Sequence, residues 1–197
     1  NGQEGIARAL DLLLEQDYSN FKIIISDNGS TDATPDICKE FLQKDARIEY
    51  HRSEENHGCN WNFNRVVKLS TGKYFMWAAH DDQRDKSFVR ECVQKMEQNP
   101  DAVLCQTHTA LYIEGRSDLL ATNDLASFEG VKGSVPQYRE TLKNFPATAI
   151  YGLYRLSVMR KIPIFENILA GDLVFIQALS ILGEFVQVPK VLFSYYG

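Results

Sequence analysis

The stretch IIISDNGSTD, residues 23–32, decides the fold that this sequence predicts. It begins with three β-branched residues, which are typical of a strand buried in a parallel sheet. The residues from Asp27 to Asp32 are those that favour tight turns. Thr34-Pro35-Asp36 then marks a helix start, with a capping hydroxyl, proline in the first turn and an acid near the positive end of the helix dipole. A buried strand that leads through a turn into a helix indicates an α/β protein.

The same alternation extends along the first half of the chain. Apolar residues at helical spacing predict helices, and short apolar runs predict strands. The predicted order is a helix over 3–16, a strand over 21–26, a helix from residue 34, a strand over 48–51, a helix over 61–69, a strand over 74–79, a helix over 88–96 and a strand over 102–106. This order predicts a three-layer α/β/α sandwich with a mainly parallel central sheet.

The pattern loosens after residue 107. Residues 114–135 are polar and weakly periodic, which predicts an exposed loop. Further elements follow from apolar spacing: a helix around Tyr138, Leu142 and Phe145, a strand over 149–154, a helix over 173–179, and closing strands over 185–188 and 191–196. We expect a single domain over residues 1–197. Because a doubly wound domain normally opens with a strand, whereas this chain opens with a helix, we also expect that the first strand is missing.

Composition limits the classes of function. The chain has 197 residues, of which 44% are apolar and 24% charged, as in ordinary globular domains. Its net charge of −5 argues against a general nucleic-acid-binding protein, whose binding surface would be basic. The four cysteines are widely scattered, which argues against a zinc site and favours a reducing, cytosolic compartment. No apolar run has the length of a transmembrane segment.

Three groups of acids are candidates for chemistry. Asp27 follows a buried strand, at the sheet edge where open α/β proteins bind ligands, although a plain turn explains this motif alone equally well. Asp81 and Asp82 follow the next apolar strand. Adjacent carboxylates repel, and Mg²⁺ or Mn²⁺ would relieve that repulsion; the alternative is a solvated turn with a helix-capping acid. Asp172 opens an apolar helix, for which an N-cap is the simpler interpretation.

Taken together, the motifs resemble the family 2 glycosyltransferases, which have the Rossmann-like GT-A fold. The resemblance covers essentially the whole chain. It rests on the order and spacing of NGQE (1–4), IIISDNGSTD (23–32), ENHG (55–58), NFN (62–64), TGKY (71–74), HDD (80–82), IYGLYR (150–155) and VPKVLFSYY (188–196).

The resemblance implies a nucleotide-binding half over 1–107 and an acceptor-binding half over 108–197. It assigns the nucleobase to Asp27 and the ribose to Asp81, and it places Asn56 and Gly58 along the nucleotide pocket. Uracil is the expected base, because Asp27 would accept from its N3; thymine and guanine stay open. The donor is therefore expected to be a nucleotide sugar, such as a UDP-sugar.

For catalysis, the resemblance implies a D-x-D motif that ends at Asp81 and Asp82, with Asp82 on Mn²⁺ or Mg²⁺. Asp172 corresponds to the general base that takes the proton of the acceptor hydroxyl, in a single displacement that inverts the anomeric carbon. The sequence departs from the family pattern at Ala79, where an Asp is commoner, and at Gly171, where a Glu is usual. The missing first strand is the third departure, and it bears on whether this chain alone is active.

The predicted function is hexosyl transfer to a saccharide or glycolipid acceptor in bacterial cell-surface synthesis. A sugar nucleotidyltransferase is one alternative, although such enzymes usually show a glycine-rich basic loop that is not visible here. The other is a catalytically inactive nucleotide-binding scaffold. Residues 108–170 carry no readable code for the acceptor. The expected location is cytoplasmic, with peripheral contact to the inner membrane face left open.

Overall fold

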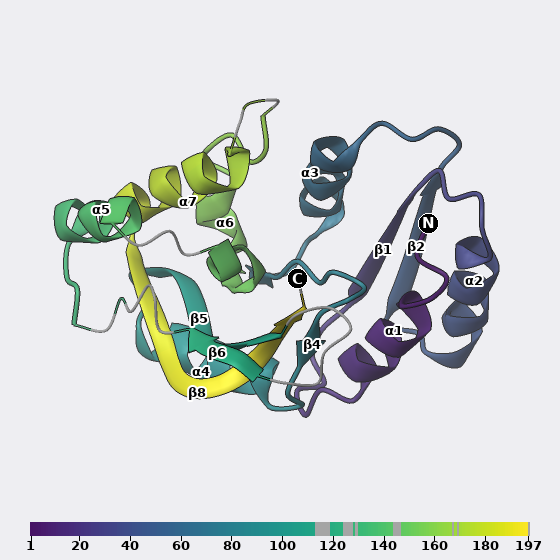
Figure 1. Ribbon diagram of the computed structural model, residues 1–197, viewed down its shortest axis with the longest axis horizontal. Helices are drawn as coiled ribbons and strands as arrows, with labels where there is room; N and C mark the ends of the chain where they lie inside the picture. The colour runs from purple at the N-terminus through teal and green to yellow at the C-terminus, as the bar shows by residue number, and fades with distance from the viewer. Residues whose placement is uncertain are drawn as a thin grey trace.

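The structure is a computed structural model that describes residues 1–112, 119–123, 128, 130–143, 147–166, 168 and 170–196. Within this part of the chain the strands form two separate sheets. β1 (Ile23–Asn28) and β2 (Ile48–Ser53) pair in parallel in the first sheet. The second has the order β3-β7-β5-β8-β4, and β6 pairs with β5. Figure 1 shows β1 and β2 at one side of the molecule and β5, β6 and β8 at the other.

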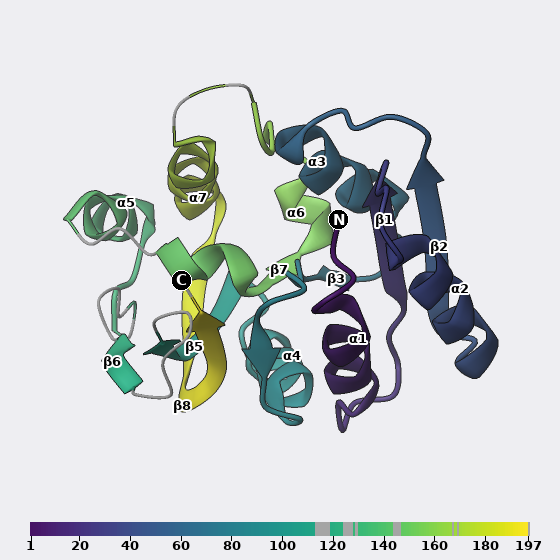
Figure 2. The same cartoon turned by 45° about the vertical axis from the view of Figure 1, so that its right-hand side comes forward.

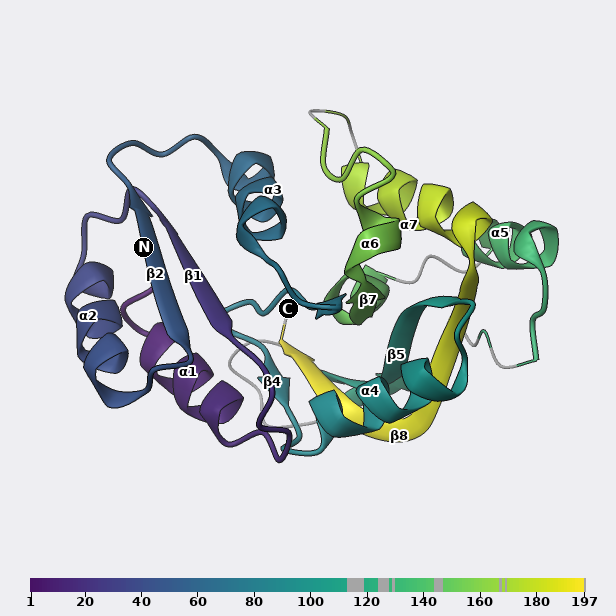
Figure 3. The same ribbon diagram turned by 180° about the vertical axis from the view of Figure 1, so that it is seen from behind.

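Helices cover both faces of the small sheet. α1 (Ile6–Leu14) and α2 (Thr34–Lys44) pack on one face, where Ile23 and Ile25 of β1 are buried against Leu10 and Phe41. Side chains alternate across a strand, so Ser26 points to the other face. There it hydrogen-bonds to α3 (Cys59–Leu69), which lies on the opposite side of β1 from α2 in Figures 1 and 3.

The larger sheet is also covered on both faces. Its strands are β3 (Tyr74–Phe75), β4 (Gln83–Arg84), β5 (Ala102–Tyr112), β6 (Leu119–Asn123), β7 (Leu153–Arg155) and β8 (Glu184–Tyr196). Cys105 of β5 faces α4 (Phe88–Gln98), whereas its neighbour Leu104 faces α7 (Gly171–Leu182). α5 (Ser134–Lys143) packs beside α7, as Figure 2 shows, and α6 (Leu156–Met159) follows β7. The three-layer arrangement is thus confirmed.

The strand directions correct the expectation of a mainly parallel sheet. β5 and β8 are parallel, but β3–β7, β7–β5, β5–β6 and β4–β8 are antiparallel pairs. A helix that connects two neighbouring strands makes them parallel, and the short strands β4 and β7 are not joined to their neighbours in this way. Their apolar patterns are also too short to show whether they run parallel or antiparallel to the neighbouring strands. β5 and β8 are long and strongly curved, which gives the sheet its curled shape (Figure 3).

Three local predictions were wrong. Part of the expected loop at 114–135 is strand β6; residues 113–118, 124–127 and 129 lie outside the described residues, as do Phe145 and Leu169. The expected strand over 149–154 is a 3₁₀ helix, η1 (Ala147–Tyr151), followed by β7. The bend between them occurs at Gly152, where a Cβ would lie 2.6 Å from the carbonyl oxygen of Cys105. The two closing strands are one strand, β8, whose register shifts where Pro189 and Lys190 are skipped.

Within the described residues, β1 pairs with β2 alone and β3 with β7 alone. One edge of each strand therefore has no partner strand, and an additional first strand stays a prediction. In the part of the chain that the structure describes, no helix combines the length and apolarity that crossing a bilayer requires.

Candidate functional site

The carboxylate of Asp27, near the end of β1, is fully enclosed. Its Oδ1 accepts a hydrogen bond of 2.8 Å from the backbone N–H of Ser30, and its Oδ2 accepts one of 2.6 Å from the hydroxyl of Tyr50. The Nε of Arg52 lies 3.7 Å from Oδ2. Burial acts to raise the pKa of Asp27, but the hydrogen bonds from Tyr50 and Ser30 and the charge of Arg52 bring this pKa below its usual value. Asp27 is therefore ionised at neutral pH and holds the turn after β1.

The turn after β1 is also joined to the loop after β2. The Nδ2 of Asn28 donates to Oδ1 of Asn56 at 2.9 Å and to the carbonyl of Gly58 at 3.0 Å, and its Oδ1 accepts from the N–H of His57. Gly29 has a φ of 77°, and a Cβ there would lie 2.8 Å from the backbone of that loop. The structure thus brings Asn56 and Gly58 together through Asn28, a residue that the sequence did not single out.

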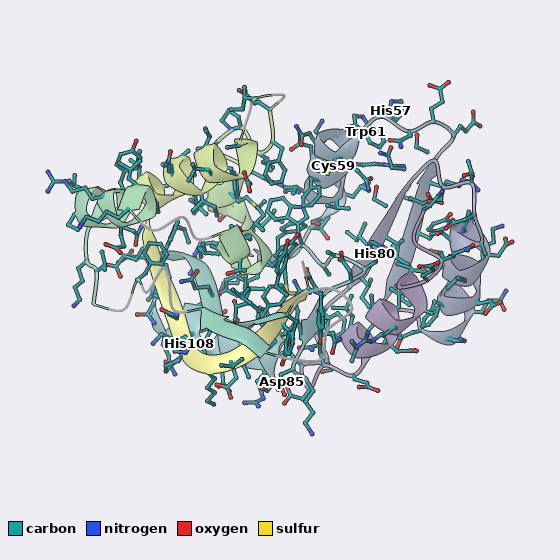
Figure 4. All side chains as sticks on the ribbon, in the orientation of Figure 1. His57, Cys59, Trp61, His80, Asp85 and His108 are labelled. Carbon is teal, nitrogen blue, oxygen red and sulfur yellow. The ribbon has the colours of Figure 1, made fainter. Side chains whose placement is uncertain are left out.

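An exposed aromatic surface adjoins this loop. The rings of His57 and Trp61 lie 4.3 Å apart, and the guanidinium of Arg65 lies 5.0 Å from the centre of the Trp61 ring. Figure 4 shows His57 on the loop and Trp61 at the start of α3, at the same end of the molecule.

The first residues of the chain link this edge to the acids after β3. The side-chain oxygen of Asn1 accepts a hydrogen bond of 2.8 Å from the N–H of Thr31, and the N–H of Gly2 donates to the hydroxyl of Thr34 at 2.8 Å. Three residues further on, Gly5 lies against His80: a Cβ at Gly5 would come within 2.7 Å of the His80 carbonyl oxygen. The segment before α1 therefore contacts both the turn after β1 and the segment after β3 that carries Asp81.

Asp81 and Asp82 have different surroundings. The side chain of Asp81 is 58% exposed and lies 3.9 Å from Nδ1 of His80. Asp82 is buried, and its Oδ2 has no hydrogen-bond partner. Burial raises the pKa of Asp82 to about 7; the charge of Arg84 acts against this shift and that of Asp81 adds to it. A buried carboxylate oxygen without a partner, next to a second carboxylate, fits an oxygen-seeking divalent cation.

Arg84 is the buried counter-charge of Asp82, which the sequence did not reveal. Its Nη2 donates to the carbonyl of Trp77 at 2.8 Å, and its guanidinium lies 4.8 Å from the ring centre of Phe193. Burial lowers its pKa to about 10. A cavity separates this pair from α1 and is lined by Ala9, Leu12, Leu13, Ala78, Ala79, Asp82 and Arg84.

Asp172 lies in the first turn of α7, and its position differs from that of the other acids. Its Oδ1 accepts a hydrogen bond of 2.9 Å from the N–H of the next residue, Leu173. The preceding Ala170 has a φ of 55°, the left-handed region that residues with a side chain rarely adopt. Within the described part of the chain, Asp172 has no hydrogen bond or ion pair to Asp81 or Asp82. Among the residues that the structure describes, no three His, Cys, Asp or Glu side chains lie close enough together to hold a metal ion.

The geometry at the sheet edge suits a polar ligand. Backbone turns, amide side chains and a fixed carboxylate meet at the carboxyl ends of β1 and β2, where α/β proteins bind ligands. The acids after β3 offer oxygen ligands for a cation, and the remaining positions in its coordination sphere would come from a phosphate group of the ligand.

Known proteins with similar sequences are glycosyltransferases. Glycosyltransferase GlyA of Streptococcus pneumoniae is 32% identical over 96 residues, which cover 49% of this chain and 14% of GlyA. A glycosyltransferase of Rickettsia prowazekii is 37% identical over 82 residues, or 42% of this chain and 24% of that protein. The chain thus spans well under half of the length of these relatives.

Solved structures show the same fold. Staphylococcus aureus TarS in complex with UDP-GlcNAc superimposes with a TM-score of 0.78 at 17% identity, over 100% of this chain and 56% of that chain. The mannosyltransferase PcManGT of Pyrobaculum calidifontis, in complex with GDP-Man and Mn²⁺, gives 0.71 at 14% identity, over 99% and 54%. These likenesses confirm the GT-A fold. The model of the family described as Glycosyl transferase family 2 matches residues 1–162, and with this match over most of its length the chain belongs to that family.

Proposed function

We propose that this chain is the donor-binding part of an inverting, metal-dependent glycosyltransferase that moves a sugar from a nucleotide sugar to an acceptor hydroxyl. The family match over residues 1–162 carries this proposal, because it supports glycosyl transfer over the synthesis of an activated sugar. The acids at the carboxyl edge of the strands, together with Asp172 on α7, would supply the groups that such a reaction needs.

The nucleotide belongs, in this proposal, at the edge formed by Asp27, Asn56, Gly58 and Asp81. Asp27 is ionised and has lone pairs beyond the two hydrogen bonds that it accepts, so it suits the N3 hydrogen of uracil. Its side chain has no solvent exposure in the structure, so this contact requires the turn after β1 to move aside. The loop held by Asn56 and Gly58 forms one wall, and the exposed carboxylate of Asp81 suits ribose hydroxyls or the cation. TarS binds UDP-GlcNAc and PcManGT binds GDP-Man, which supports a nucleotide-sugar donor and leaves the base to be measured.

Asp81 and Asp82 would hold Mn²⁺ or Mg²⁺. The unpartnered Oδ2 of Asp82 and the accessible carboxylate of Asp81 are the donor atoms that fit such a cation. When bound, the cation would offset negative charge on the diphosphate leaving group. The charge of Arg84 favours the ionised form of Asp82, which is the form that binds metal.

Asp172 is the proposed general base. Its side chain is partly exposed at the start of α7, where it would accept the proton of the acceptor hydroxyl during attack on the anomeric carbon. One displacement inverts the configuration, so one base is sufficient. The acceptor is proposed to be a saccharide or glycolipid of the bacterial cell surface, and the enzyme to act in the cytoplasm, where it could contact the inner face of the membrane.

Calorimetric titration of the full-length protein with UDP, with and without Mn²⁺, tests this function. We expect binding that depends on the metal and that Asp82→Ala abolishes, while Asp36→Ala, an exposed acid on α2, binds as the wild type does. Binding of GDP or dTDP alone would correct the base. If no nucleotide binds with or without metal, both the transferase proposal and the nucleotide-binding scaffold alternative fail. Nucleotide binding without sugar transfer would favour the scaffold alternative.

A further inference from the structure

We infer that Asn64, assisted by Asn60, is a positioning residue that sets where Asp172 stands relative to the nucleotide edge; this inference rests on the proposed function. Both asparagines lie on α3, more than 100 positions along the chain from the segment that they hold. Paired backbone contacts, a close glycine contact and a strained residue together connect α3 to Asp172.

The first contact is a two-point match between an amide side chain and a backbone. The Nδ2 of Asn64 donates to the carbonyl of Phe165 at 2.7 Å, and its Oδ1 accepts from the N–H of the same residue at 3.1 Å. The Nδ2 of Asn60, one turn earlier, donates to the carbonyl of Glu166 at 3.1 Å. A side chain that satisfies both backbone groups of one residue fixes its orientation as well as its position.

The second contact carries this position to α7. Gly171, the first residue of the helix, packs against the segment: a Cβ there would lie 3.3 Å from the carbonyl oxygen of Glu166 and 3.8 Å from the ring of Phe165. Ala170, just before it, is held at a φ of 55°. A strained backbone persists only where its surroundings hold it in place, and Asp172 is the next residue but one.

The same helix is anchored at the nucleotide edge. Asn62, on the other side of α3, donates through Nδ2 to the carbonyl of Ser26 at 3.0 Å and accepts from the Ser26 hydroxyl at 2.6 Å. Ser26 directly precedes Asp27 on β1. Three asparagines at alternate positions therefore tie α3 to β1 and to the segment before Asp172. This makes α3 the bridge that sets the distance between the proposed base and the bound donor.

The ring of Phe165 also packs between α3 and α7. It contacts Phe63 of α3 edge-on, with ring centres 5.1 Å apart, and lies 5.9 Å from Phe175 of α7. We expect these rings to stay packed when Asn64 is replaced, so loss of the amide should shift the segment without unfolding it.

Asn64→Leu, which keeps the size of the side chain and removes its hydrogen bonds, tests the inference in the full-length enzyme. Misplacing a catalytic group by about 1 Å can cost roughly 100-fold in rate, so we expect kcat to fall about 10- to 100-fold while the Kd for UDP stays within about threefold. Asn60→Ala should lower kcat less. Lys68→Ala, an exposed residue of the same helix, is the matched control and should leave both constants unchanged.

Hydrogen exchange provides a second readout. The amide of Phe165 and those of the first turn of α7 should exchange roughly tenfold faster in Asn64→Leu, while the amides of β1 keep their rates. An unchanged kcat in a folded Asn64→Leu enzyme overturns the inference, as does a loss of UDP affinity equal to the loss of kcat. If Asn64→Leu does not fold, Asn60→Ala decides by the same two readouts. A wild-type enzyme without transfer activity would instead refute the proposed function.

Discussion

The nucleotide edge and the start of α7 differ in how their acids are held. Asp27 has both oxygens engaged, by Tyr50 and by the backbone of Ser30, and is closed off from solvent. Asp172 accepts one hydrogen bond, from its own neighbour, and lies two residues after Ala170, whose backbone is strained. Asp27 is fixed by hydrogen bonds to its own side chain, whereas the position of Asp172 depends on contacts that the chain makes several residues before it, at Phe165 and Glu166. If these two regions are the proposed donor site and general base, a rigid donor site and an adjustable base would allow acceptors to vary while the donor stays the same.

Asp172→Asn should produce the largest effect, because it removes the proposed base and leaves the hydrogen bonds to Asp27 untouched. General-base catalysis typically contributes roughly 100- to 10,000-fold to a rate, so we expect transfer to fall by that factor with UDP binding nearly intact. Transfer rates in the full-length enzyme and calorimetric UDP titration measure both. More than a few per cent of wild-type transfer would remove Asp172 from this role.

Asp27→Ala should break the network of hydrogen bonds around this residue. It leaves the hydroxyl of Tyr50 and the N–H of Ser30 without their acceptor and the charge of Arg52 without its counter-charge, so the free energy of unfolding should fall by about 3 kcal/mol. Urea unfolding of this variant, compared with Asp36→Ala on the exposed face of α2, measures the difference. Equal stability of the two variants would mean that the network does not lock the turn.

Tyr50→Phe should lower the free energy of unfolding by an amount that depends on pH, because it removes one of the hydrogen bonds to Asp27. The variant loses one charge-assisted hydrogen bond, which costs about 1.5 kcal/mol or more at neutral pH. Because the folded-state pKa of Asp27 lies below its usual 3.8, the ionised carboxylate stabilises the fold above that value, and this contribution is lost as the pH falls through the folded-state pKa. The difference in unfolding free energy between wild type and Tyr50→Phe should therefore shrink as the pH falls below 3.8. A difference that does not change with pH would contradict this account.

Ala170→Gly should have the smallest effect and the opposite sign. A Cβ in the left-handed region costs about 1 kcal/mol, and the greater freedom of glycine in the unfolded chain offsets part of this gain. We expect the free energy of unfolding to rise by about 0.5 kcal/mol, seen as a small increase in the melting temperature. A decrease would show that Ala170 is not strained.

Much of the fold follows from local sequence, because buried strands and amphipathic helices have local signals in the spacing of their apolar residues. IIIS at residues 23–26 lies within β1, and α2 begins at Thr34 as expected. The expected capping hydroxyl was wrong: the N-cap of α2 is Ala33, and the hydroxyl of Thr34 accepts a hydrogen bond from the N–H of Gly2 instead. The sequence did not predict β6 or the bend at Gly152. β6 forms by pairing with β5, and Gly152 is required because the backbone of β5 passes close to it, so neither depends on its own apolar pattern.

The candidate site shows the same division. Asp27, Asp81, Asp82 and Asp172 each follow or begin an apolar element, so they could be found in the sequence. Other residues of the site depend on contacts between distant segments. Tyr50 lies opposite Ile25 in the β1–β2 register, and Asn64 meets Phe165 across 101 positions. An ordinary NFN motif on a helix does not reveal which backbone its amides will hold.

The division of the strands into two sheets also has a consequence for cooperativity. β1, β2, α1 and α2 bury an apolar cluster that is separate from the two clusters of the larger sheet. Its buried residues are Leu10, Ile23, Ile25, Cys38, Phe41 and Ile48. A two-stranded sheet depends on the helices packed against it, and the apolar cluster of this half is smaller than those of the larger sheet, so this half should be the first to open on heating. A nucleotide sugar that contacts Asp27 on one side and Asp81 on the other would join the two halves. The bound donor would then couple the unfolding of the two halves. In the presence of saturating donor, two thermal unfolding transitions should merge into one.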